Sequence, residues 1–193
     1  MNSPREASPR FNCDPAQAPA ASQPALARLR QAVGGTPNLA VAMAGSPALI
    51  EAFETVRALF HQHSTFSTPE RELVFLVNAT ENGCGYCTAI HSLFGTKEGL
   101  PAAAIEAVRA KRLPADPRLA ALAAFARRLI SQRGLVSPSD WEQFLAAGFK
   151  SEQAIELVAA AALSTMANYA GRLTQPTLDG FLQPFAAAED TAA

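Results

Sequence analysis

The chain has 193 residues, of which 49% are hydrophobic and 17% are charged, and its formal net charge is -1. This length suits a single folded domain, and the near-neutral charge argues against a basic surface that binds nucleic acid or anionic membranes. No apolar run approaches the roughly 20 residues of a membrane span, and no secretory signal is evident, so we expect a cytoplasmic protein without nucleic-acid or membrane partners.

The first predicted element is a flexible N-terminal arm over residues 1–24. It is rich in Pro, Ala, Ser and Asn and lacks a sustained apolar period. We predict that residues 25–193 form one helical domain. Cys13 lies in the arm with no cysteine or histidine nearby, so we interpret it as an incidental thiol, with a resolving or intersubunit role as the alternative.

Helix starts recur from Ser46 onward, where a small polar residue repeatedly precedes a proline. The polar side chain can cap a helix, and proline suits the first helical position because its missing N–H costs nothing there. The pairs are Ser46-Pro47, Thr68-Pro69, Asp116-Pro117 and Ser137-Pro138. Glycines that could end helices are Gly83, Gly95, Gly134 and Gly148. With apolar residues spaced by three or four between these marks, we predict an all-α protein of about six to eight helices.

Two apolar segments need separate interpretation. The run from Leu73 to Val77 has β-forming composition, but it follows a helix cap and is predicted to be helical. The Ala-rich segment from Glu152 to Leu173 is apolar nearly all round. It is therefore expected to be a central helix or one packed against another copy of the chain.

The stretch NGCGYCTAIH, residues 82–91, gathers the groups best suited to chemistry. If a helix begins near Cys84, then Cys84, Cys87 and His91 lie on one helical face. The positive helix end and a nearby imidazole both favour thiolate, and the spacing of the two cysteines allows a disulfide between them. We therefore expect oxidation to join these two cysteines within one chain and to leave Cys13 free.

Two further polar residues lie in apolar helical segments. Glu72 either faces solvent beside Arg71 or points into a semi-buried site, where its raised pKa would suit proton relay. Periodicity alone favours the solvent-facing orientation. Asn168 and Tyr169 need polar partners if they are buried, either at a pocket or at an interface.

The segment ERELVFLVNATENGCGYCTAIH, residues 70–91, resembles the alkylhydroperoxidase D-like, peroxidase-related branch of the carboxymuconolactone decarboxylase superfamily. The shared pattern is a glutamate twelve residues before C-x-x-C-x-x-x-H, and the flanks agree from roughly Gly35 to Phe185. The resemblance implies an alkylhydroperoxidase D-like helical bundle, assembly into homo-oligomers, and a thiol-dependent peroxidase or disulfide oxidoreductase activity.

The resemblance also implies roles for individual residues. Cys87 matches the cysteine that peroxide attacks and Cys84 its resolving partner, while Glu72 and His91 match a proton relay. Tyr86 stands where the best-studied peroxidases have histidine, and its hydroxyl cannot act as a base near neutral pH. The expected partners are a small hydroperoxide or disulfide substrate and a dithiol reductant of the lipoyl or thioredoxin type, with no cofactor.

Besides the possibility that Cys84 and Cys87 are inert core thiols, three alternatives remain open at this point. Two thiols and an imidazole could bind zinc, with His61 or His63 as a further ligand. A second enzymatic alternative is the decarboxylase or lactone chemistry of other superfamily members, which typically lack the dithiol. The third is a redox-sensing or assembly protein without turnover, whose disulfide changes a helix interface.

Overall fold

A computed structural model describes residues 14–186, and within this range the chain forms nine α-helices, three short 3₁₀ helices and no strand. The all-α prediction is confirmed. The α-helices are α1 Gln23–Val33, α2 Asn38–Met43, α3 Pro47–His63, α4 Thr68–Glu81, α5 Gly85–Lys97, α6 Ala102–Arg109, α7 Pro117–Ser131, α8 Pro138–Ala146 and α9 Ser151–Thr174. The 3₁₀ helices are η1 Pro15–Gln17, η2 Ala20–Ser22 and η3 Gly180–Phe185. The count exceeds the predicted six to eight, since α1 and α2 precede the first Ser-Pro signal.

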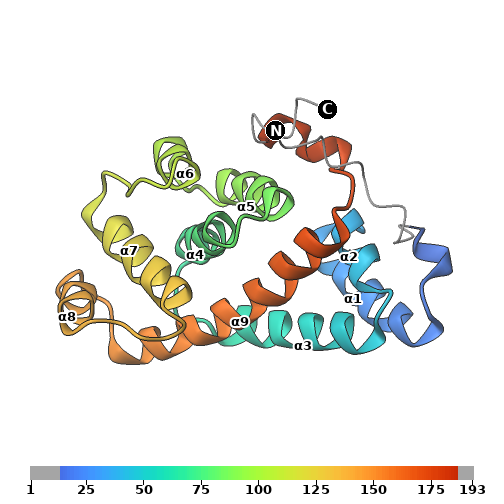
Figure 1. Cartoon of the computed structure of the whole chain (residues 1–193), viewed down its shortest axis with the longest axis horizontal. Helices are drawn as coiled ribbons and strands as arrows, with labels where there is room; N and C mark the ends of the chain where they lie inside the picture. The colour runs from blue at the N-terminus through green and yellow to red at the C-terminus, as the bar shows by residue number, and fades with distance from the viewer. Residues whose placement is uncertain (1–13, 187–193) are drawn as a thin grey trace, which may run out of the picture.

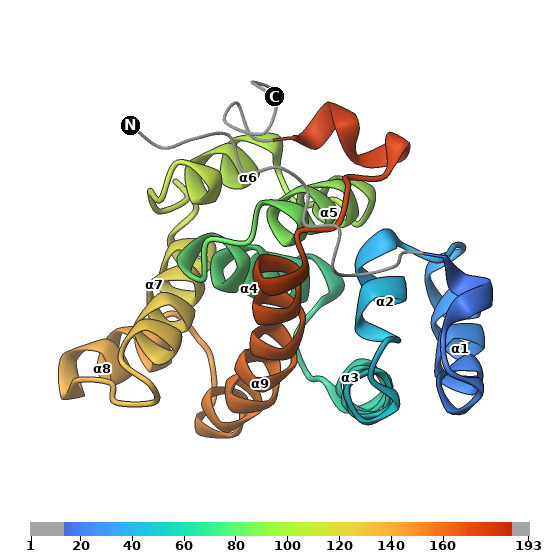
Figure 2. The same ribbon diagram turned by 45° about the vertical axis from the view of Figure 1, so that its right-hand side comes forward.

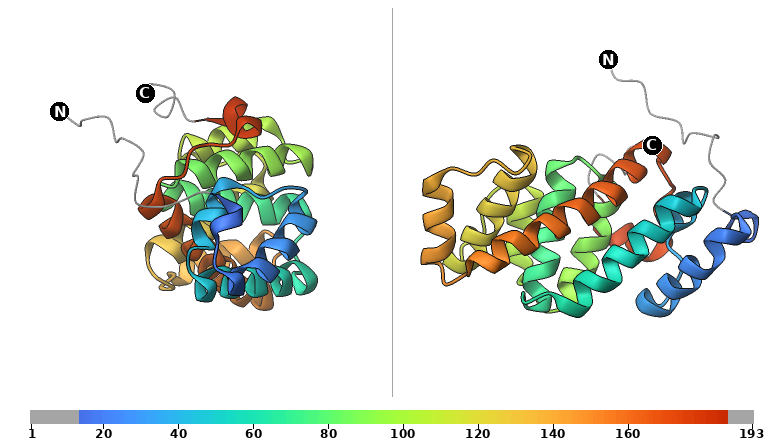
Figure 3. Two further views of the ribbon diagram at one scale, coloured as in Figure 1. Left: turned by 90° about the vertical axis from the view of Figure 1, so that its right-hand side faces the viewer. Right: turned by 90° about the horizontal axis from the view of Figure 1, so that it is seen from below.

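Helix α9 is the central element of the fold. It runs diagonally across the molecule and packs against α2, α3, α4, α5 and α7 (Figure 1). Seen after a turn of 45°, α9 lies between α4 on one side and α2 and α3 on the other (Figure 2). From below, α8 and α1 occupy opposite ends of the molecule (Figure 3). The predicted central position of this Ala-rich segment is confirmed.

Three of the four predicted helix caps are confirmed, and one is displaced by a residue. Ser46, Asp116 and Ser137 each accept a hydrogen bond from a backbone N–H in the first turn of the helix that follows. For α4, however, the N-cap is Ser67 rather than Thr68. Both residues can cap a helix, and the carboxylate of Glu70 selects Ser67 by accepting from its backbone N–H and its hydroxyl, each at 2.9 Å.

Gly95 was expected to end a helix, and this expectation is wrong. It lies inside α5 and is buried. A Cβ at this position would come within 3.2 Å of Leu100 Cδ2, so the position is closely packed. The helix continues to Lys97, and Gly99, with φ of 85°, makes the turn instead.

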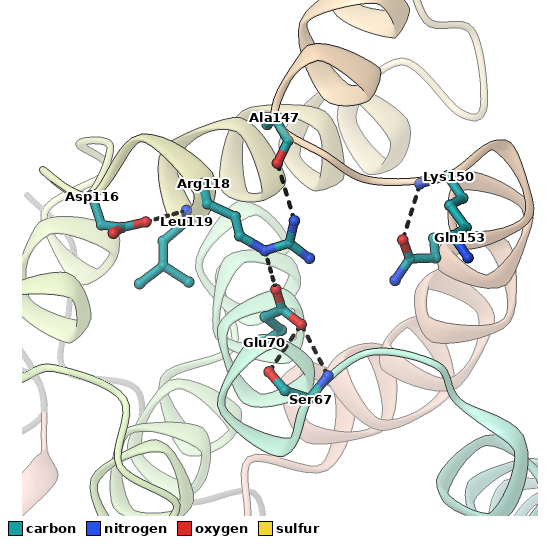
Figure 4. Close-up of polar contacts among 8 residues, drawn as sticks. All are labelled: Ser67, Glu70, Asp116, Arg118, Leu119, Ala147, Lys150 and Gln153. Carbon is teal, nitrogen blue, oxygen red and sulfur yellow. Dashed lines mark hydrogen bonds and ion pairs between the residues drawn. The ribbon is translucent and has the colours of Figure 1, made fainter.

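Arg118 of α7 fixes the beginning of α4 (Figure 4). Its Nε donates to Glu70 Oε1 at 2.8 Å, and its Nη1 donates to the carbonyl of Ala147 at 3.0 Å. The same guanidinium lies 3.8 Å from the centre of the Phe149 ring. One side chain thus connects α7, the loop before α9 and the first turn of α4. Helix α4 also carries Glu72, just after this turn.

The buried apolar residues form two clusters. The larger joins α4, α6, α7, α8 and α9, and includes Leu73, Leu76 and Val77, so the segment with β-forming composition is a core helix. The second cluster joins α1, α2, α5 and the C-terminal segment. It contains Cys84 and Cys87, which places the dithiol inside the apolar interior rather than on the surface.

The end of the predicted N-terminal arm packs against the body of the protein. Ser22 is fully buried, and its hydroxyl donates to the carbonyl of Ala44 at 2.7 Å. Residues 1–13, including Cys13, lie outside the described residues. None of the helices between residues 14 and 186 combines the length and the apolar character that a membrane crossing would need.

Candidate active site

The dithiol forms the first turn of α5. Cys84 is the N-cap, its Sγ accepts from the N–H of Cys87 at 3.2 Å, and its own N–H donates to the carbonyl of Ala79 at 3.0 Å. Gly83, with φ of 65°, makes the turn from α4 into α5, a conformation that favours glycine. The predicted helix start near Cys84 is confirmed.

Cys84 and Cys87 are joined by a disulfide within one chain, with their Cα atoms 5.3 Å apart. Both residues are almost fully buried, with exposed fractions of 2% and 1%. The predicted intrachain pairing is present in the structure. The accompanying prediction that Cys13 stays free lies outside the described residues.

Glu72 and His91 form a pair between α4 and α5. His91 Nδ1 lies 2.9 Å from Glu72 Oε2, and Glu72 is only 5% exposed. The solvent-facing orientation that periodicity favoured for Glu72 is therefore wrong. An antiparallel neighbour, α5, covers this face of α4 and supplies the polar partner, which the spacing of apolar residues along α4 alone could not reveal.

The pair determines which nitrogen of His91 is free. A carboxylate can only accept hydrogen bonds, so Nδ1 of His91 is the donor, and the neutral ring keeps Nε2 as its basic atom. The ring also stacks on Phe75, with centroids 5.1 Å apart. The contacts with Glu72 and Phe75 thus fix the orientation of the His91 ring.

A cavity of about 610 Å³ opens beside these residues. Cys87, His91 and Glu72 all line it, together with apolar side chains from α1, α2, α3, α4, α5 and α9. Cys84 does not line the cavity. The volume falls within the usual range for small-molecule sites. A molecule in this cavity would therefore lie beside Cys87 and the Glu72–His91 pair together.

Tyr86, a predicted supporting residue, lines the cavity, but its hydroxyl is engaged elsewhere. It donates to Asp179 in the segment before η3. Burial and the Asp179 carboxylate raise the pKa of Tyr86 above its ordinary value of 10, so the phenol stays protonated. Asp179 also accepts from the N–H of Asn38 at 3.2 Å. Asp179 therefore ties the C-terminal segment to α5 through Tyr86 and to α2 through Asn38.

Asn168, the second predicted supporting residue, is 1% exposed and also lines the cavity. Its Oδ1 accepts from Asn82 Nδ2 at 2.8 Å, so its polar partner is the residue that caps α4. Tyr169, in contrast, is 60% exposed and does not share this buried position. The pairing links α9 to the loop that carries the dithiol.

Several contributors to the site carried no sequence signal. The side chains from α1, α2 and α3 that wall the cavity are ordinary apolar residues, and Asp179 lies far from the motif in sequence. Gly171 packs against the dithiol: a Cβ there would lie 2.8 Å from Cys84 Sγ. Among residues 14–186, no group of three His, Cys, Asp or Glu side chains is placed to hold a metal ion.

Comparisons with known proteins found a family model that matches the central part of the chain. Residues 47–128 match the model of the carboxymuconolactone decarboxylase family, a range that contains Glu72, both cysteines and His91. No curated protein matches the chain.

Solved structures with the same fold include two proteins described as peroxidase-related. The one from Ralstonia eutropha JMP134, which has an alkylhydroperoxidase AhpD core, is 22% identical over 90% of this chain and 93% of its own, with a TM-score of 0.78. The one from Silicibacter sp. TM1040 is 20% identical over 94% and 97%, with a TM-score of 0.74. The third, a variant of the debrominase Bmp8 with 2,3,4-tribromopyrrole, is 16% identical over 92% and 95%, with a TM-score of 0.75.

Proposed function

Because its family match and its fold place the chain in the carboxymuconolactone decarboxylase superfamily with an AhpD-like architecture, we propose that it is a thiol-dependent peroxidase. Cys87 is the attacking thiolate, Cys84 is the resolving thiol, and Glu72 with His91 is the proton relay. The observation that carries the proposal is that Cys87, and not Cys84, is among the residues that line the cavity, as are Glu72 and His91.

In the first step the reduced Cys87 thiolate attacks the terminal oxygen of a hydroperoxide. The O–O bond breaks, a sulfenic acid forms on Cys87, and the alkoxide leaves with a proton that the relay supplies. His91 can take the proton from the Cys87 thiol at Nε2, since Nδ1 donates to Glu72. The same imidazolium then returns a proton to the leaving oxygen.

In the second step the Cys84 thiolate attacks the sulfenic sulfur, a disulfide forms, and water leaves. Cys84 is suited to this role, since its sulfur accepts the Cys87 N–H at the positive end of α5. An external dithiol then supplies two electrons and two protons to restore the thiols. One turnover converts a hydroperoxide and a dithiol into an alcohol, a disulfide and water.

A coupled turnover assay tests the proposal. The wild-type protein is expected to consume cumene hydroperoxide with dihydrolipoamide as reductant, and Cys87→Ser is expected to abolish turnover. A relay variant, Glu72→Gln, keeps the shape of the side chain while removing its charge. It should lower the rate by roughly 10²-fold or more if proton transfer matters. Wild-type protein that is inactive with peroxides while its disulfide is fully reducible would refute the peroxidase activity.

A second candidate is thiolate attack on a different electrophile, a disulfide or a halogenated ring. It is favoured by the apolar cavity walls and by the commitment of the Tyr86 hydroxyl to Asp179, which leaves that position without a base. The debrominase with this fold was solved with a brominated pyrrole. Bromide release from 2,3,4-tribromopyrrole, measured beside peroxide consumption with the same reductant, separates the two candidates.

A further inference from the structure

The cavity has two chemically distinct ends. Helices α4 and α5 run antiparallel, since Cys84 bonds to Ala79 near the end of α4 while His91 pairs with Glu72 near its start. Arg71 also lines the cavity, at the start of α4. Eight residues separate it from Ala79, which at 1.5 Å per residue is about 12 Å along the helix. The cavity therefore extends from Cys87 to the guanidinium of Arg71.

Arg71 has no carboxylate partner among residues 14–186. Its Nη1 donates to the carbonyl of Phe66 at 3.0 Å and its Nη2 to the hydroxyl of Thr68 at 2.9 Å. Its buried Nε has no hydrogen-bond partner in the described part of the chain. Arg57, which lines the same end, differs because both of its bonds go to the carboxylate of Glu54. Of these two arginines, only Arg71 carries an unneutralised charge on the cavity wall.

Positive side chains outnumber negative ones at this end, where Arg57, Arg71 and Lys97 line the cavity together with Glu72 and Glu98. His61 lines the cavity here, and its pKa is lowered from 6.5 by burial first and then by the charges of Arg57 and Arg71. Glu72 acts in the opposite direction, since its carboxylate also lies on the cavity wall. The remaining acid of this end, Glu98, has the oppositely charged Lys97 as its chain neighbour on the same wall. An anion entering the cavity would therefore be attracted to Arg71.

Between the two ends the walls are apolar. Phe53, Phe75, Ile90 and Phe94 line the cavity from α3, α4 and α5. Such a surface favours a hydrocarbon body, which is stabilised in proportion to the apolar area that it buries.

Building on the peroxidase function proposed above, we propose that the substrate is an amphipathic carboxylate. Its carboxylate binds the guanidinium of Arg71, its hydrocarbon body lies along α5, and its peroxide group reaches Cys87. Arg71 is then a specificity residue: it recognises one end of the substrate while the chemistry takes place at the other.

Binding of unreactive probes tests this inference without requiring turnover. Octanoate and octan-1-ol share one hydrocarbon chain and differ only at the head group, and each is titrated calorimetrically into the Cys87→Ser protein. Octanoate is expected to bind about tenfold tighter or more, as a charge-assisted hydrogen bond to a half-buried guanidinium predicts. Equal affinities, tighter binding of the alcohol, or no binding of either probe would overturn the inference.

Two variants assign the preference to Arg71. Arg71→Met is expected to reduce the preference for octanoate about tenfold, and Arg71→Lys, which keeps the charge but not the planar fork, should give an intermediate preference. Arg112→Met removes the same charge from an exposed position outside the cavity and should leave the preference intact. An equal loss in Arg112→Met would overturn the assignment. Arg71→Lys decides the matter if Arg71→Met does not fold.

Because the probes are unreactive, the two proposals can fail separately. A protein that binds octanoate through Arg71 but consumes no hydroperoxide refutes the peroxidase function and leaves the carboxylate site standing. A protein that consumes neutral hydroperoxides but binds octanoate no more tightly than octan-1-ol refutes the carboxylate site and leaves the peroxidase function standing.

Discussion

Gly171 gives the sharpest test of how the dithiol is packed. It lies in α9, and a Cβ at this position would come 2.8 Å from Cys84 Sγ, 3.6 Å from Leu39 Cδ1 and 3.7 Å from Cys87 Sγ. Non-bonded heavy atoms normally approach to about 3.5–4.0 Å, so the first contact is too short by roughly 1 Å. Cys84 is the N-cap of α5 and its backbone bonds to Ala79, so its sulfur has little freedom to move away.

Two opposing effects set the magnitude for Gly171→Ala. Alanine is favoured over glycine inside a helix by about 1 kcal/mol. Overpacking a close-packed interior destabilises by about 1–3 kcal/mol. We therefore predict a net destabilisation of about 1 kcal/mol, within a range of about 0–2 kcal/mol. The effect should be larger in the oxidised protein, where the disulfide holds both sulfurs in place, so the variant's disulfide should also be easier to reduce.

Urea unfolding of the oxidised and reduced proteins measures this effect, and Gly95→Ala is the matched control. Gly95 is also inside a helix, but its nearest neighbour is the tip of a flexible side chain, Leu100 Cδ2 at 3.2 Å. The control should be neutral or slightly stabilising. A Gly171→Ala protein that is as stable as the control in both redox states would show that the close approach of α9 to the dithiol has been misjudged.

Three further predictions each concern a single residue or surface. Tyr86→Phe should destabilise the protein by about 1–3 kcal/mol, since the hydrogen bond to Asp179 is lost. Tyr169→Phe, at a 60% exposed position, should change stability by less than about 0.5 kcal/mol, and equal effects of the two variants in urea unfolding would contradict the role of Tyr86. Burial and the charges of Arg57 and Arg71 lower the pKa of His61 against the opposing effect of Glu72, so the unfolded chain binds this proton more readily than the folded one. The stability of the protein should therefore fall as the pH drops from about 6.5 towards the lowered pKa. His61→Gln should make the urea midpoint depend less on pH between about pH 7 and 5, and an unchanged dependence would refute this. We predict that the chain forms a homo-oligomer through the outer face of α9, where Ile155 and Leu173 are 70% and 72% exposed. Light scattering should show that Leu173→Glu weakens this oligomer, and a wild-type monomer at micromolar concentration would rule the oligomer out.

Local signals in the sequence predicted the helices where the physical cause is itself local. Ser46, Asp116 and Ser137 cap helices because each needs only its own side chain and the next three backbone N–H groups. The start of α4 was misplaced by one residue because Ser67 and Thr68 are equally competent caps, and Glu70 decides between them. Gly95 was misjudged because glycine alone does not stop a helix, and the turn after α5 is made by Gly99 instead.

The sequence predicted the part of the site that lies on one face of α5. The spacing of Cys84, Cys87 and His91 places them together at the start of α5 without any tertiary information. For Glu72 the residues alone left two orientations open and periodicity along α4 favoured the solvent-facing one, so only the family resemblance assigned it to the relay. Asp179 and Gly171 could not be predicted, because both act from the C-terminal part of the chain and only the fold brings them to the dithiol.

The most direct test of the account is a single-turnover experiment on the two cysteines. Reduced Cys84→Ser protein is treated with one equivalent of cumene hydroperoxide in the presence of dimedone, and the labelled residue is identified by peptide mass spectrometry. Because Cys87 lines the cavity with the relay pair and Cys84 does not, the account predicts consumption of the peroxide and a dimedone adduct on Cys87, with no adduct on Cys84 in the Cys87→Ser protein. An adduct on Cys84 in Cys87→Ser, with none on Cys87 in Cys84→Ser, would contradict it.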